Sequence, residues 1–241
     1  EQALRDRNEA LEDAARVKPA FVSNMSSELR TPLTSIAGFA EMIQSGYAGE
    51  LTDQTRDYVD AIITSTTRLA RLIDNVLDLT QGAAGGLPME RKPQDVEGLF
   101  RAAADRFKTV ATERSVTIAL SLRPNLGIIK GDERRIRQAL DHVIDNAVRY
   151  VQLGGRVLIH AEGSHKSVRL VVSDDGPGID SKTQARIFDS FARFGRNSQG
   201  ETTGLGLPLV RQFVEAHGGT VSLVSEPGQG TIVTIDLPRG D

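Results

Sequence analysis

Two long apolar stripes at helical spacing dominate the first third of the chain. From Glu1 to about Ser45, apolar residues recur at steps of three, four and seven within a run of helix formers. A second stripe runs from Tyr58 to about Gln81, after a break at 46–50 that holds two glycines, with Thr52 as the candidate N-cap. This pattern predicts a helical hairpin.

A hairpin cannot cover both stripes, because two helices share only one face. The simplest remedy is a second copy of the chain, which would give a homodimeric four-helix bundle. Docking of the stripes on the rest of the same chain is the alternative, and the sequence leaves it open.

Composition excludes several classes of protein. The chain has 29 Lys and Arg against 32 Asp and Glu, a formal net charge of -3, so no overall positive field favours nucleic acid as a partner. It has no cysteine, which excludes disulfides, thiolate zinc sites and cysteine nucleophiles and suits a reducing cytoplasm. No apolar run approaches the roughly 18 residues of a membrane span. The start in mid-helix without Met predicts a soluble, cytoplasmic fragment of a larger protein.

A cluster of small and helix-breaking residues, 81–88, predicts a linker. We therefore predict a hairpin domain over 1–82, a linker over 83–94 and a second domain over 95–241. In the second domain helical and alternating segments follow one another, which predicts an α + α/β chain overall. The expected helices are 95–112, 132–150 and 205–217, and the expected strands are 116–122, 128–130, 156–161, 168–173, 220–224 and 231–237. The polar stretch 180–203 is expected to be irregular, either a functional lid or a disordered loop.

Asp174 ends a predicted buried strand and is followed by Gly176 and Gly178. A carboxylate there can accept a hydrogen bond from the exocyclic amine of adenine, and the glycines let a ligand approach the main chain. A plain turn is the alternative explanation, and the motif alone barely outweighs it.

Gly204, Leu205 and Gly206 open a predicted helix whose first turn contains Pro208. Free N–H groups and the positive end of the helix dipole would suit a phosphate. A simple glycine hinge beside a buried helix is the alternative.

The preceding helix carries Asn146, Arg149 and Tyr150 near its end. Asn146 could offer a carbonyl oxygen to Mg²⁺, Arg149 a charge to a phosphate and Tyr150 a ring to a base. Each could equally be an ordinary helix-surface residue. The combination with the two glycine motifs is what favours a nucleotide site.

These motifs resemble, in order, the N, G1, F, G2 and G3 boxes of sensor histidine kinases, and the segment 21–33 resembles the family's H box. The resemblance implies a dimerising phosphoacceptor hairpin followed by an α/β-sandwich ATP-binding domain of the type shared with gyrase, Hsp90 and MutL. It also implies ATP or ADP with Mg²⁺ as cofactors, the receiver of a response regulator as a partner, and a larger sensor that is membrane-associated or localised at a cell pole. The matching segments are 131–140 with 145–147, 174–179, 187–191, 204–207 and 228–231.

The acceptor position departs from the family. Where the family has the histidine that receives phosphate, this chain has Ser27, and none of its four histidines lies in the hairpin. In the family Glu28 would orient the imidazole and Thr31 would help to place the water that removes phosphate from a receiver. A serine hydroxyl keeps its proton until a strong base removes it, so we predict that autophosphorylation is lost. A polar position before a proline is an equal alternative for Thr31.

Two smaller departures are His142, in place of the first asparagine of the N box, and Thr202, in place of the first glycine of the G2 box. Three interpretations remain. The first is a pseudokinase that binds nucleotide and a receiver and regulates another kinase, as in a divergent cell-cycle branch of the family with tyrosine at the acceptor position. The second is an active histidine kinase whose acceptor is changed to serine. The third is an ATPase of the gyrase and Hsp90 group, with Asp145 as its candidate carboxylate.

Overall fold

The computed structural model describes residues 26, 28–83, 87–190 and 204–240. The chain divides into two compact units, Glu1–Leu87 and Pro88–Asp241. In the described part of the chain no helix is both long enough and apolar enough to cross a membrane.

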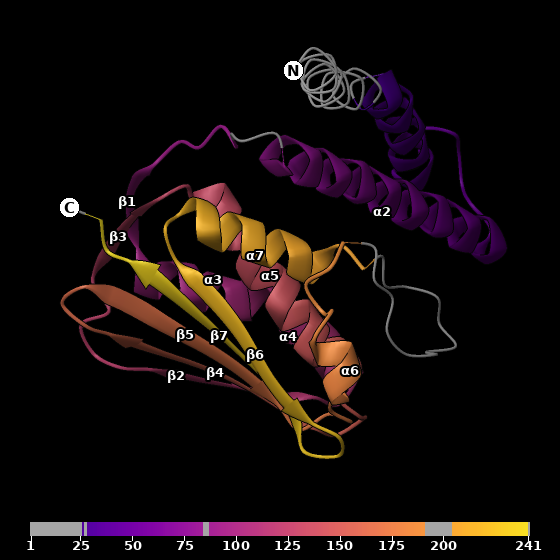
Figure 1. The fold of residues 1–241 in the computed structure, drawn as a ribbon. Helices are drawn as coiled ribbons and strands as arrows, with labels where there is room; N and C mark the ends of the chain where they lie inside the picture. Colours follow the sequence, from indigo (N-terminus) through magenta and orange to yellow (C-terminus); the bar gives the residue numbers. More distant parts are fainter. Residues whose placement is uncertain (1–25, 27, 84–86, 191–203, 241) are drawn as a thin grey trace, which may run out of the picture. The chain divides into compact units, whose positions relative to one another are not determined.

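The first unit is a helical hairpin. Its first helix covers 28–44 within the described residues, and the second, α2, covers Asp53–Ala83 (Figure 1). Thr52 precedes α2, and its Oγ1 accepts a hydrogen bond from the N–H of Thr55 at 3.2 Å. This side-chain cap was expected from the sequence. Residues 1–25, the greater part of the expected first helix, lie outside the described residues.

Two polar contacts define the register of the hairpin. Arg30 forms an ion pair of 2.5 Å with Asp74, and the side-chain amide of Gln44 donates to Asp60 at 2.5 Å. The two contacts are separated by the same interval on each helix, equal to two heptads, so the helices keep one antiparallel register between them.

Much of the apolar stripe of the hairpin stays exposed within one chain. Ala40 and Val59 are buried, but Phe39 is 66% exposed. The other exposed large apolar residues of the two helices are Leu29, Ile36, Met42, Tyr58, Ile62 and Leu69.

The second unit is a five-stranded sheet with helices over one face. Figure 1 shows α3, α5 and α7 lying along that face. The strand order is β2-β4-β5-β7-β6; β2 pairs with β4 in parallel and the other neighbours are antiparallel. The strands are β2 (Thr117–Leu122), β4 (Arg156–Gly163), β5 (Ser167–Asp174), β6 (Thr220–Glu226) and β7 (Gly230–Pro238), and the helices are α3 (Val96–Arg106), α4 (Lys108–Glu113), α5 (Glu133–Tyr150), α6 (Ser181–Gln184) and α7 (Gly206–Ala216).

The core lies between this sheet and its helices. Alternate residues of the central strands point inward, as the period of two requires. On β5, Val168, Leu170 and Val172 are at most 2% exposed, and Phe213 on α7 is 1% exposed. The expected helix-and-sheet fold is therefore confirmed.

Two expectations about elements were wrong. Strand β1 (Lys92–Asp95) begins inside the segment 83–94 that was predicted as linker, and it pairs with β3 (Ile128–Gly131) in a separate two-stranded sheet. The helix expected over 95–112 is divided into α3 and α4 at Phe107, whose N–H bonds to Ala104 three residues back instead of four. Asp95 caps α3, and its carboxylate accepts from the N–H of Gly98.

Candidate functional site

Asp174 lies at the end of β5, in the middle of the sheet, paired with Val157 of β4 and Thr231 of β7. Its Oδ1 accepts a hydrogen bond from the N–H of Gly176 at 2.9 Å. Burial raises the pKa of the Asp174 carboxyl, and hydrogen bonds from the N–H groups of Gly176 and Thr231 act in the opposite direction. The result is a half-buried acceptor whose charged form is costly without a further hydrogen-bond donor.

The turn after Asp174 has no room for side chains at two positions. A Cβ at Gly176 would lie 2.7 Å from Asp174 Oδ1 and 3.3 Å from the carbonyl oxygen of Tyr150. Gly178 has φ +68°, and a Cβ there would overlap the carbonyl oxygen of Glu226. Both positions require glycine, one for space and the other also for backbone conformation.

Sequence reasoning missed the residues that hold this turn in place. The N–H of Ile179 donates to the buried Ser225 Oγ at 2.9 Å, and that hydroxyl donates to the carbonyl of Gly230 at 2.7 Å. The side chain of Gln184 donates to the carbonyls of Ile179 and Ser225, each at 2.7 Å. A polar residue at an inward position of β6 was the available signal, because Ile179 and Gln184, which Ser225 contacts, lie more than forty positions away.

The last turns of α5 carry three of the predicted site residues. Asn146 and Tyr150 are half-buried, whereas Arg149 is exposed and its Nε forms an ion pair of 2.7 Å with Asp145. A Cβ at Gly176 would lie 3.3 Å from the carbonyl oxygen of Tyr150, so the end of α5 lies beside the Asp174 turn.

The start of α7 lies against the same helix. Gly204 has φ +68°, Leu205 is 2% exposed and Gly206 is the first residue of α7. A Cβ at Gly206 would meet Nδ1 of His142 at 3.4 Å, so the N-terminus of α7 packs one turn before Asn146. The structure thus gathers the predicted residues of the second unit around the end of β5, the end of α5 and the start of α7.

The acceptor segment belongs to the first unit. Ser27 lies outside the described residues, and so does Thr202. Glu28 and Thr31 are exposed on the first helix. The helix continues through Pro32, where the hydroxyls of Thr34 and Ser35 donate to carbonyls four residues back.

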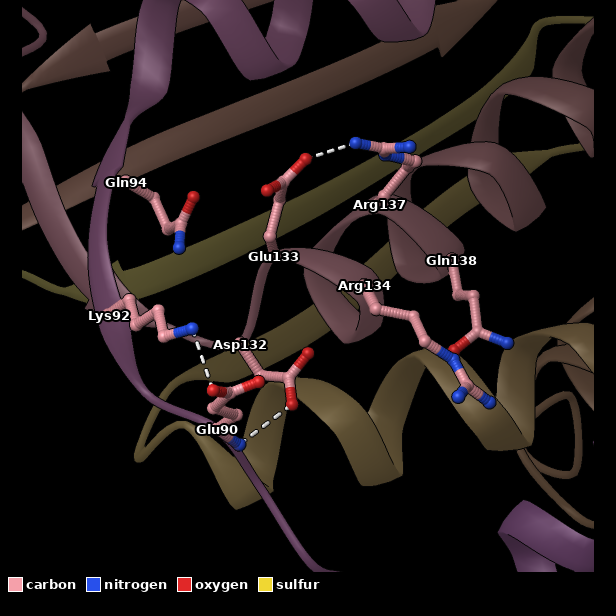
Figure 2. Close-up of a pocket in the computed structure, with 8 residues that line it drawn as sticks. All are labelled: Glu90, Lys92, Gln94, Asp132, Glu133, Arg134, Arg137 and Gln138. Atoms are coloured by element: carbon pink, nitrogen blue, oxygen red, sulfur yellow. Dashed lines mark hydrogen bonds and ion pairs between the residues drawn. The ribbon is translucent and has the colours of Figure 1, made fainter.

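A polar cavity of about 500 Å³ lies near the other end of α5 (Figure 2). Figure 2 shows Glu90 and Lys92 on one side of it and Arg134 with Gln138 on the other. The remaining lining residues are Gln94, Asp132, Glu133 and Arg137. Sequence reasoning did not predict this cavity. Within the described residues, no group of three or more His, Asp or Glu side chains converges as a metal site.

Two family descriptions match the chain in succession. Residues 18–85 match the His Kinase A (phospho-acceptor) domain, and residues 131–241 match the histidine kinase-, DNA gyrase B- and HSP90-like ATPase. The chain belongs to the sensor histidine kinase family. It joins the phospho-acceptor hairpin of that family to its ATPase domain.

Curated relatives match over almost the whole chain. The sensor protein DivL of Caulobacter vibrioides is 43% identical over 99% of this chain and 30% of its own length. The histidine protein kinase DivJ of the same organism is 32% identical over 99% of this chain and 40% of its own. The chain spans about a third of the length of such relatives.

Solved structures of histidine kinases share the fold. Full-length ShkA in complex with AMPPNP is 33% identical, covers 91% of this chain and 46% of its own, and has a TM-score of 0.76. The catalytic domain of ThkA is 26% identical, with a TM-score of 0.56, over 63% of this chain and 97% of its own.

Proposed function

We propose that this histidine-kinase core is a dimeric signalling module that binds ATP or ADP with Mg²⁺ and docks the receiver of a response regulator, and that it does not phosphorylate itself. The observation that carries this proposal is Ser27, a serine at the acceptor position of a core that keeps Asn146, Asp174 and the glycines at 176, 178, 204 and 206.

Nucleotide binding rests on the grouping around Asp174. The Asp174 carboxyl offers a half-buried acceptor for an exocyclic amine, and the glycines at 176 and 178 keep side chains out of the approach. The N-terminus of α7 at Gly206 offers N–H donors and a helix dipole to phosphates. The AMPPNP complex of the related ShkA supports the same assignment.

The residues of the proposed nucleotide site could hold Mg²⁺ only when a bound nucleotide supplies further ligands. The side-chain carbonyl of Asn146 is a ligand type that Mg²⁺ accepts, and the ion usually keeps several waters and phosphate oxygens besides one or two protein groups. With no acidic cluster in the described part of the second unit, Asn146 would hold a metal whose other ligands come from phosphates and water. Bound in that way, the ion would neutralise phosphate charge.

Loss of autophosphorylation rests on the chemistry of the hydroxyl at position 27. A neutral imidazole is nucleophilic near pH 7, whereas a serine hydroxyl needs a base strong enough to take its proton, and a lone carboxylate such as Glu28 is a poor base for that task. A serine phosphoester also lacks the transfer potential of phosphohistidine. Output would then come from binding, because the chain would bind a receiver and thereby regulate another kinase.

Dimerisation and receiver docking rest on the exposed face of the hairpin. A half-exposed apolar stripe in one chain needs a covering partner, and a second hairpin would supply the matching stripe. We assign the receiver to the lower part of the bundle around Ser27, Thr31 and residues 36–42, with Phe39 itself assigned to the interface between the two hairpins. The histidine kinase ThkA has been crystallised in complex with the response regulator protein TrrA.

The deciding experiment is incubation of the purified chain with γ-labelled ATP and Mg²⁺ and, in parallel, calorimetric titration with ADP and ATP. We expect nucleotide binding without protein labelling. Stoichiometric, Ser27-dependent label that moves on to a receiver would overturn the pseudokinase assignment. Absence of binding heat would overturn the nucleotide assignment.

A second candidate function is that of an active histidine kinase whose acceptor has been changed to serine. The intact segment around position 27, with Glu28 and Thr31 exposed on the first helix, favours it. The variant Ser27→His separates the two, because regained labelling would favour this candidate. The ATPase interpretation is weaker, because its candidate carboxylate, Asp145, is held in an ion pair by Arg149.

A further inference from the structure

Helices α5 and α7 lie antiparallel and meet at both ends of α7. At the start of α7, a Cβ at Gly206 would lie 3.4 Å from Nδ1 of His142, which is in the middle of α5. At the other end the main-chain N–H of Asp132, the N-cap of α5, donates to Nε2 of His217 at 2.9 Å. Ten positions separate Asp132 from His142, and eleven separate Gly206 from His217. Both contacts therefore belong to one rigid pair of helices about 15 Å long.

A third contact lies about one turn in from the Asp132–His217 end of the pair. The guanidinium of Arg135, near the start of α5, lies 5.1 Å from the centre of the Phe213 ring, near the end of α7. Both residues are buried, Arg135 at 6% exposed and Phe213 at 1%. The helices are also packed between their two meeting points, where Ala139 and Leu140 of α5 and Val210 of α7 are buried. A shift at one end is therefore passed along the pair, because packed cores do not deform freely.

His217 is fixed as a neutral imidazole by its two contacts. Its Nδ1–H donates to the carbonyl of Phe213 at 2.7 Å, so Nε2 is left as the acceptor for Asp132. The side chain is buried, and the Cβ that Gly131 lacks would lie 3.0 Å from its ring. Burial lowers the pKa of His217, and the nearby charge of Arg91 lowers it further, whereas the bond to Phe213 and the charge of Asp132 raise it.

The segment that enters the second unit is fastened to the same place. Arg91 donates to the carbonyl of Ala216, the last residue of α7, at 2.6 Å. The N–H of Glu90 donates to the carboxylate of Asp132 at 2.9 Å (Figure 2). One segment thus holds the start of α5 and the end of α7 together, and it leads directly into β1.

We propose that His217 and Arg91 are positioning residues for the nucleotide site: they join the outer ends of α5 and α7 and so hold the opposite ends, with Asn146 and Gly206, at the spacing that a nucleotide needs. We name the contacts of Arg91, Asp132, Ala216 and His217 the latch. The inference rests on the proposed nucleotide binding and deepens it.

Protonation would open the latch. A proton on Nε2 turns the acceptor of the Asp132 N–H into a second donor, and the two N–H groups then face each other. Around the ring, Arg91 disfavours the added charge and the Asp132 carboxylate favours it. Arg135 on α5 lies over Phe213, and Glu215 is the nearest acid on α7 itself. The latch is therefore closed at neutral pH and opens as the pH falls below the ordinary histidine range.

The test compares the dissociation constant for ADP with Mg²⁺ across pH in the whole chain and in His217→Gln. The glutamine amide oxygen can accept from the Asp132 N–H but cannot titrate, and the titration of the nucleotide phosphates is common to both proteins. We expect equal affinities at about pH 8 and, as the pH falls below about 6, a growing loss of affinity in the unaltered chain relative to His217→Gln that reaches at least about threefold before the chain unfolds.

Further variants separate positioning from folding. Arg91→Ala should weaken ADP binding at every pH, whereas Lys92→Ala, which removes a 64%-exposed partner of Glu90 on the same segment, should not. A ratio of affinities between the unaltered chain and His217→Gln that stays flat with pH would overturn the inference. If the unaltered chain binds no nucleotide at any pH, the proposed function itself fails.

Discussion

Oδ1 of Asp174 accepts a hydrogen bond from the N–H of Gly176 at 2.9 Å, so the carboxyl group assigned to the adenine amine also closes the turn that admits the ligand. The Asp174 carboxyl group therefore contributes both to folding and to the proposed binding of the nucleotide. A substitution there is expected to change stability and affinity in different ways.

The variant Asp174→Asn should separate binding from stability. The pKa of Asp174 is raised in the folded chain, so deprotonation at neutral pH costs folding free energy, and the neutral amide should leave the melting temperature unchanged or higher. ADP affinity should fall about tenfold or more, because the amide loses the charged acceptor. Calorimetry and thermal melts measure the two effects, and undiminished affinity would contradict the assignment.

The same carboxyl predicts how binding depends on pH. The ionised form is the acceptor, so affinity for ADP should decline as the pH falls through the raised pKa of Asp174, that is, above the ordinary range of an aspartate. The Asp174→Asn protein should lack this part of the profile. An equal decline of ADP affinity in the variant would show that a group other than Asp174 titrates.

Gly178→Ala should be more damaging than Gly228→Ala. Both glycines have positive φ, +68° and +78°, but a Cβ at Gly178 would overlap the Glu226 carbonyl and one at Gly228 meets nothing within 4 Å. We expect a loss of about 1 kcal/mol from backbone strain at Gly228 and clearly more at Gly178, where the turn must also move. Urea unfolding gives the difference; equal losses would show that space at Gly178 is not limiting.

Phe39→Asp should shift the chain from dimer to monomer. Phe39 is 66% exposed in one hairpin, and a charge there would be buried in a bundle of two hairpins. Leu153→Asp, at a 78%-exposed apolar residue of the second unit, is the matched control and should leave the mass unchanged. Light scattering after gel filtration measures both. A Phe39→Asp protein that keeps the dimer mass would place the interface elsewhere.

Breaking the Arg30–Asp74 pair should have a small effect. Their side chains are 52% and 38% exposed, so solvent screens the pair. Arg30→Ala should cost no more than about 1 kcal/mol of unfolding free energy, and less at high salt. A double-mutant cycle with Asp74→Ala isolates the pair energy, and a value of several kcal/mol would mean that the pair is shielded from solvent.

The sequence predicted the elements that have a strong period. The strand 168–173 and the helix 132–150 were found almost to the residue, since the alternation of a strand and the apolar period of a helix are local signals. Strand β1 was missed because its four residues, with one proline and mostly exposed side chains, have no alternation to detect. The break at Phe107 was missed because no glycine or proline marks it.

The residues of the candidate site also fall into those that a local sequence pattern indicates and those that it does not. Asp174 and its glycines are local in sequence, and so are the glycines before α7. Ser225 and Gln184 support the Asp174 turn from other elements, and His217 meets Asp132 across 85 positions. No short pattern records such partners, because only the completed fold brings them together.

The matched spans of α5 and α7 restrict how such a domain can vary in length. An extra residue inserted in α5 between Asp132 and His142 would rotate everything beyond it by about 100° around the helix axis. Only a compensating insertion in α7 between Gly206 and His217 could restore both meeting points. Related chains should therefore gain or lose residues in loops, or in both helices at once, and never in one of the two alone.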